Sequence, residues 1–166
     1  MIRTPMKLIA LLLLVVSGAP TSRAEDPHPI QWSLISRAST LPLRKGSPVE
    51  AMLRAKILPG WHLYAMDQLA GGPTATRMNL QPNQPFVLVG SIEPERAPII
   101  MNDPNFNLES RYYEGEASFH FSVKATSPVS AAQAKLTVDV LFQTCNDRMC
   151  LPPSVVHVST QVRVGR

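Results

Sequence analysis

The chain has 166 residues, a length typical of one domain, and its 16 basic and 12 acidic residues give a formal net charge of +4. Three of the basic residues, Arg3, Lys7 and Arg23, precede residue 25, so the remainder carries 13 basic and 12 acidic side chains. This near-neutral balance, without a Lys/Arg cluster, excludes the basic surface that nucleic-acid binding requires.

The first 24 residues have the pattern of a secretory signal peptide. Two basic residues precede an unbroken apolar run over residues 8–16, which is too short to span a bilayer comfortably. Ser22-Arg23-Ala24 then places small residues where a signal peptidase reads the chain. We predict cleavage after Ala24, which leaves residues 25–166 as one exported domain without membrane insertion. An uncleaved anchor is the alternative.

The rest of the chain shows the two-residue periodicity of half-buried strands. For example, the alternate residues Leu136, Val138, Val140 and Phe142 are all apolar, and polar residues lie between most of them. Short strands separated by turn signals such as Pro59-Gly60, without crossover helices, predict an all-β antiparallel sandwich or barrel. The predicted strands cover residues 32–39, 49–57, 61–65, 75–80, 86–92, 119–123, 136–143 and 155–164. Residues 130–134 are predicted to form a single helical turn.

The segment 101–111 fits the strand pattern poorly. It contains Asn102, Asp103, Pro104, Asn105 and Asn107 around one aromatic residue, Phe106. Turn-forming residues at this density predict a loop. The ring of Phe106 either pins this loop to the core or is presented at the surface.

Two cysteines, Cys145 and Cys150, lie in the sequence Phe-Gln-Thr-Cys-Asn-Asp-Arg-Met-Cys-Leu-Pro-Pro. In an oxidising compartment we expect them to pair across the mouth of a hairpin, in an exposed bridge. A bridge that only staples the hairpin would gain about 2 kcal/mol, against about 4.7 kcal/mol for a loop of 100 residues. Redox exchange is therefore favoured over a structural staple, and metal ligation is a third alternative. Arg148 in the loop would favour a reactive thiolate, whereas Asp147 would oppose it.

A copper site is a further hypothesis, because His62 and Met66 are four residues apart and Met149 precedes Cys150. Sulfur and imidazole ligands suit copper(I), but this spacing shares one face only on a helix, and the segment is predicted to be extended. No spacing among the histidines indicates a hydrolytic triad or a zinc site, and no phosphate-binding loop is present. We therefore expect neither a metal nor another cofactor.

The cysteine motif resembles the amino-terminal periplasmic domain of the DsbD family of transmembrane thiol reductases. The residues that carry the resemblance are 142–145 and 150–153, with weaker support from 59–64, 71–73 and 113–115. It implies an immunoglobulin-like β-sandwich over residues 30–164. It also implies a role as a protein-disulfide reductase component, which takes electrons from a membrane-linked thioredoxin-like donor and passes them to oxidised envelope proteins.

The resemblance further implies roles for individual residues. Cys150 would form the mixed disulfide with partners and Cys145 would resolve it, while Phe106, or Tyr112 or Tyr113, would cap the cysteines. Four residues separate the cysteines, against five in the best-known family member. The sequence ends at Arg166 without the family's membrane section and carboxy-terminal domain, so we expect a stand-alone domain with a separate donor. A non-redox binding module, or service to a client such as a cytochrome c maturation factor, is the alternative.

Overall fold

A computed structural model describes residues 28–165, so the predicted signal peptide lies outside the described residues. Within these residues, twelve strands and one short 3₁₀ turn, Ala131–Gln133, follow each other. The strands are β1 (Ile30–Ala38), β2 (Pro48–Ile57), β3 (Trp61–Tyr64), β4 (Arg77–Leu80), β5 (Phe86–Pro94), β6 (Ile99–Asp103), β7 (Leu108–Tyr113), β8 (Glu116–Ala125), β9 (Lys135–Phe142), β10 (Thr144–Asn146), β11 (Ser154–Gln161) and β12 (Arg163–Val164). No helix within residues 28–165 is long and apolar enough to cross a membrane.

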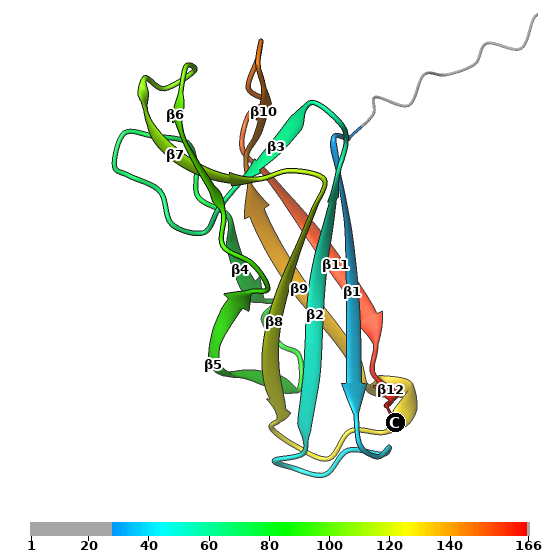
Figure 1. Ribbon diagram of the computed structural model, residues 1–166. Helices are drawn as coiled ribbons and strands as arrows, with labels where there is room; N and C mark the ends of the chain where they lie inside the picture. Colours follow the sequence, from blue (N-terminus) through cyan, green and yellow to red (C-terminus); the bar gives the residue numbers. More distant parts are fainter. Residues whose placement is uncertain (1–27, 166) are drawn as a thin grey trace, which may run out of the picture.

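Two sheets face each other in the body of the molecule. One has the strand order β12-β1-β2-β8-β5 and the other has the order β11-β9-β4. A third sheet, with the order β10-β3-β7-β6, lies at one end, away from β12 and the C-terminus (Figure 1). All strand pairs are antiparallel except the short pair of β1 with β12. The predicted all-β sandwich is therefore confirmed.

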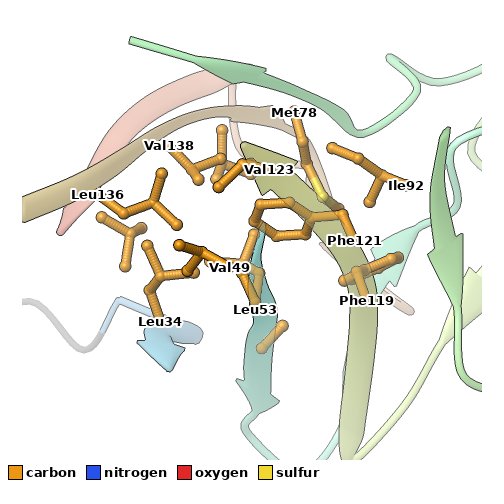
Figure 2. Close-up of a cluster of buried hydrophobic side chains, with 14 of the residues drawn as sticks. Leu34, Val49, Leu53, Met78, Ile92, Phe119, Phe121, Val123, Leu136 and Val138 are labelled. Atoms are coloured by element: carbon orange, nitrogen blue, oxygen red, sulfur yellow. The ribbon is translucent and has the colours of Figure 1, made fainter. Parts of the chain in front are cut away.

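The core forms where the apolar faces of the facing sheets meet. The alternating apolar residues of β2 and β9 are buried, as the sequence pattern predicts. Leu53, Phe119, Val123, Leu136 and Val138 are fully buried between the sheets (Figure 2). Side chains on successive strand positions point to opposite faces, so this alternation places one apolar row from each strand in the core.

The loop predicted over residues 101–111 is wrong for most of its length. The segment forms a hairpin in which β6 pairs with β7, and only residues 104–107 make the turn. The turn-forming residues are concentrated at this tip. The amides of Phe106 and Asn107 donate hydrogen bonds to the carbonyl oxygen of Asp103, and Asn107 has a positive φ of 52°. The predicted strand 155–164 is also interrupted, because Val162 turns into the core between β11 and β12.

Candidate functional site

The four-stranded sheet at the end of the molecule has two different faces. On β3, Leu63 packs into the main core, whereas His62 and Tyr64 point to the opposite face. A four-residue turn positions this strand, with the amide of Trp61 bonded to the carbonyl of Leu58 and Gly60 at a φ of 77° between them. Proline followed by glycine in such a turn is a type II signature, so the Pro59-Gly60 sequence sets where β3 begins.

Cys145 lies on the outward face of this sheet, because β10 pairs with β3 and Cys145 is opposite His62. The hydroxyl of Thr144 donates a hydrogen bond of 2.7 Å to the carbonyl of His62, which fixes the pairing. Paired residues of antiparallel strands share a face. The sheet register therefore places the first cysteine beside His62 and Tyr64.

The turn after Cys145 brings Cys150 back to it. The side-chain oxygen of Asn146 accepts hydrogen bonds of 2.9 Å from the amides of Arg148 and Met149, a turn geometry that asparagine favours. Cys145 and Cys150 are joined by a disulfide, with their Cα atoms 4.0 Å apart. The expected pairing of the two cysteines is confirmed.

The two cysteines differ in exposure. Cys145 is fully buried, whereas Cys150 is half-buried, so the expectation of an exposed bridge is wrong for Cys145. Asp147 and Arg148 are both exposed at the tip of the turn. An approaching thiolate can therefore reach the disulfide more easily from the side of Cys150.

Aromatic side chains surround the buried sulfur. Cys145 forms a cluster with Tyr64 and Tyr112, against which Phe106 and Cys150 also pack. The ring of Phe106 meets that of Tyr64 edge-on at a centroid distance of 5.9 Å. Phe106 and Tyr112, both predicted as cap residues, thus lie at the disulfide. Tyr113 does not, because it points to the other sheet face and packs on Phe119 in the main core.

A buried carboxylate holds the turn that carries Phe106, which we name the cap loop (residues 104–107). The hydroxyl of Tyr64 donates a hydrogen bond of 2.6 Å to Oδ2 of Asp103, and the amide of Asn105 donates one of 2.8 Å to Oδ1. Only 2% of Asp103 is exposed. Both carboxylate oxygens are therefore used, one to bind the sheet and one to shape the cap loop.

His62 completes this network. Its Nε2 lies 3.3 Å from the hydroxyl oxygen of Tyr64, and since that hydroxyl donates its proton to Asp103, Nε2 acts as the donor. Burial raises the pKa of Tyr64, and so do its hydrogen bond to Asp103 and the negative charge of Asp103. This phenol therefore stays protonated.

The copper hypothesis joined His62 with Met66 and Met149, but Met66 packs on the main core and Met149 is exposed. Within residues 28–165 no group of three or more His, Cys, Asp or Glu side chains is placed to hold a metal ion.

Sequence reasoning missed Tyr64 and Asp103. Tyr64 stands in the motif 59–64, and its alternation with His62 on one strand was the available signal. Asp103 was counted only as a turn-forming residue. Its contact with Tyr64 depends on the order of β3, β7 and β6, which no local pattern specifies.

Replacing His62 should change how stability depends on pH. Burial lowers the pKa of His62, and the negative charges of Asp103, Glu114 and Asp147 oppose this shift only in part. The folded state therefore binds this proton less readily than the unfolded chain, in which the histidine pKa is about 6.5. The free energy of unfolding should decrease as the pH falls below that value, while well above it this group contributes no pH dependence.

Urea unfolding between about pH 5 and pH 8 measures this dependence. His62→Gln should show a smaller decrease in unfolding free energy on the acid side than the wild-type protein. The matched control is His120→Gln, at an exposed histidine of β8 that makes only a long contact of 3.9 Å with Glu95, and it should change the slope less than His62→Gln does. Equal slopes for the wild-type protein and His62→Gln would contradict the role assigned to the burial of His62.

Comparison with solved structures finds a similar fold in another domain. The chain is similar to the N-terminal periplasmic domain of ScsB from Proteus mirabilis, with 17% sequence identity and a TM-score of 0.59. That similarity covers 82% of this chain and 48% of the other, so this chain spans about half the length of that relative. It is also similar to the N-terminal domain of Neisseria meningitidis DsbD in the reduced form, with 16% identity, a TM-score of 0.47, and coverage of 77% and 83%. No curated protein matches the chain in sequence.

The family match rests on sequence and extends well beyond the cysteines. The model of the family "Thiol:disulfide interchange protein DsbD, N-terminal" matches residues 35–161, from β1 to the end of β11. The match therefore includes the two cysteines, the cap loop and most of both facing sheets. Because it extends over most of the sequence, the chain belongs to the family of N-terminal domains of the thiol:disulfide interchange protein DsbD.

Proposed function

We propose that this protein is a periplasmic thiol–disulfide interchange domain that relays electrons through Cys145 and Cys150. The proposed donor is a membrane-linked thioredoxin-like protein, and the proposed acceptors are oxidised proteins of the cell envelope. The observation that carries the proposal is the asymmetric burial of the bridge, with Cys145 enclosed and Cys150 partly open. Family membership and the relative described as periplasmic support the chemistry and the compartment.

The asymmetry supports a different role for each sulfur in this proposal. A donor thiolate attacks Sγ of Cys150, which forms a donor–Cys150 disulfide and releases Cys145 as a thiolate that takes up a proton. The second thiolate of the donor then displaces Cys150, so the donor leaves oxidised and this protein holds a dithiol. Two electrons have moved from the donor to the Cys145–Cys150 pair.

Electrons pass from the reduced domain to the acceptor through the same two sulfur atoms, in the reverse order of steps. The thiolate of Cys150 attacks a disulfide of the acceptor and forms a mixed disulfide. Cys145 then attacks Sγ of Cys150, which restores the bridge and releases the acceptor as a dithiol. Tyr64, in the cluster with Cys145, and His62, opposite it in the sheet register, lie beside the sulfur that resolves the mixed disulfide.

Covalent trapping tests this assignment. Cys145→Ala leaves Cys150 able to attack but removes the resolving thiol, so mixed disulfides with periplasmic proteins should accumulate. Non-reducing electrophoresis would show them as bands that disappear on reduction. The matched control is Cys150→Ala, which retains only the enclosed sulfur and should trap little. If neither variant, or both equally, formed adducts, the proposed role of Cys150 would be contradicted.

A further inference from the structure

The sheet face that carries the disulfide continues onto the edge strand β6. In the register of β6 with β7, Ile99 pairs with Tyr112 and Met101 pairs with Ser110. Tyr112 belongs to the cluster around Cys145, and paired residues share a face. Ile99 and Met101 therefore lie on the face of the disulfide, and Ile100 between them lies on the opposite face.

This part of β6 is unusually apolar for the edge of a sheet. Among the described strands, β6 is the last of its sheet, and Ile99, Ile100 and Met101 are 44%, 58% and 38% exposed. Edge strands commonly carry charged residues, prolines or bulges that discourage contact, and Ile99–Met101 has none of these. A single exposed apolar residue is ordinary, but consecutive ones on an open edge beside a reactive group indicate a surface that a partner covers.

β6 is close enough to the disulfide for a single partner protein to contact both in one interface. Neighbouring strands lie about 4.8 Å apart, so three strand spacings separate β10 from β6 by roughly 14 Å. A standard interface buries about 800 Å² on each partner, which corresponds to a patch roughly 30 Å across. A partner whose interface is centred near Cys150 is therefore wide enough to contact β6 as well. The side-chain amide of Asn105 donates a long hydrogen bond of 3.5 Å to the carbonyl of Asn146, which joins the cap loop to the cysteine turn within this area.

We name Ile99 and Met101 on this face the apolar strip. The chemistry of the side chains around it limits what can bind there. The β6 and β7 residues on this face are apolar or uncharged, except for Asp103, whose carboxylate is buried and bonded to Tyr64. Val87, Leu88 and Val89 form another exposed apolar run on β5, but that strand belongs to a different sheet. Of these two runs, the one on β6 is continuous with the disulfide face and the one on β5 is not.

We propose that Ile99 and Met101 form a docking surface for the protein dithiol that reduces the Cys145–Cys150 bridge. The partner presents uncharged, apolar side chains next to its attacking cysteine, and these cover the strip while the cysteine reaches Cys150. This inference rests on the proposed function, because it assigns the strip to the donor of that same exchange. It adds that recognition extends three strands away from the reacting sulfur atoms.

The test compares a protein reductant with a small one. Reduced thioredoxin serves as the protein dithiol and dithiothreitol as the small dithiol, and each reacts with the oxidised protein under pseudo-first-order conditions. Ile99→Asp and Met101→Asp should each slow reduction by thioredoxin about tenfold, since each places a charge in an apolar contact. Their rates with dithiothreitol should stay at the wild-type value. The matched control is Ile100→Asp, on the same strand and more exposed, which should leave both rates unchanged.

The remaining outcomes separate the docking surface from the exchange function. If thioredoxin reduced all variants at the wild-type rate, the docking surface would be overturned and the exchange function would stand. An equal loss in the Ile100 variant would also overturn it, because the effect would then not depend on the sheet face. A changed rate with dithiothreitol would show that the aspartate variants had loosened β6. Ile99→Thr and Met101→Thr would then replace them in the comparison, since threonine is compatible with strands. A wild-type bridge that resisted both reductants would count against the exchange function itself.

Discussion

Replacing Phe106 with Ala should make the disulfide react with dithiothreitol about tenfold faster than in the wild-type protein. The ring packs on Tyr64 and on the cluster that holds Cys145, and Cys150 packs there too. Loss of these aromatic and apolar contacts should destabilise the closed cap loop by roughly 1–2 kcal/mol. If attack on Cys150 requires an open loop, the rate rises in proportion to the open fraction.

A second variant separates the effect of losing the aromatic ring from the effect of any substitution at this position. Phe106→Tyr keeps the ring and should react and unfold nearly as the wild type does, whereas Phe106→Ala should lose no more than about the same 1–2 kcal/mol of unfolding free energy in urea. Stopped-flow detection of the released thiols gives the rates. If Phe106→Ala reacted no faster than Phe106→Tyr, the ring would only anchor the turn, and the proposed cap would be wrong.

Disrupting the contact between Tyr64 and Asp103 should have the second large effect, this time on stability. Asp103→Ala removes a buried acceptor and leaves the Tyr64 hydroxyl without its 2.6 Å partner. A buried hydrogen bond to a charged group contributes about 1.5–3 kcal/mol. Since Asp103 also holds the amide of Asn105, its loss should loosen the cap loop and speed reduction by dithiothreitol.

A double-mutant cycle isolates this pair. Urea unfolding of Tyr64→Phe, Asp103→Ala and the double variant should give a coupling free energy of about 1.5–3 kcal/mol. The comparison pair is Ser122 and Glu50, whose hydrogen bond of 2.7 Å is similar in length but exposed. Its coupling should stay below about 1 kcal/mol because solvent competes for both groups. A coupling free energy between Tyr64 and Asp103 no larger than this would contradict the claim that their buried hydrogen bond stabilises the fold.

The fold could be predicted from the sequence because its strands alternate so regularly. The buried rows of β2, β8 and β9 are the apolar rows seen in the sequence. The hairpin of β6 and β7 was missed because Asn, Asp and Pro dominate its centre and hide two short strands on either side. Ile99–Met101, moreover, has no polar alternation to mark it as a strand, since its apolar residues are exposed on both faces.

The site was only partly predictable. The local sequence was sufficient to pair Cys145 with Cys150 and to single out Phe106. Asp103 and Tyr64 lie 39 residues apart and meet only because β3, β7 and β6 are neighbours in one sheet. Such a contact depends on strand order, which a two-residue periodicity does not encode. The burial of Cys145 likewise follows from the pairing of β10 with β3 rather than from the cysteine turn itself.

The reduction potential of the Cys145–Cys150 bridge tests the central claim most directly. The folded protein would be equilibrated in dithiothreitol or glutathione buffers of graded potential, and its free thiols alkylated and counted. A bridge that exchanges electrons should have a potential above about −300 mV, in the range of known exchange proteins, roughly −120 to −270 mV. A potential below about −300 mV would mark the bridge as a structural staple of the hairpin, and the relay would be contradicted.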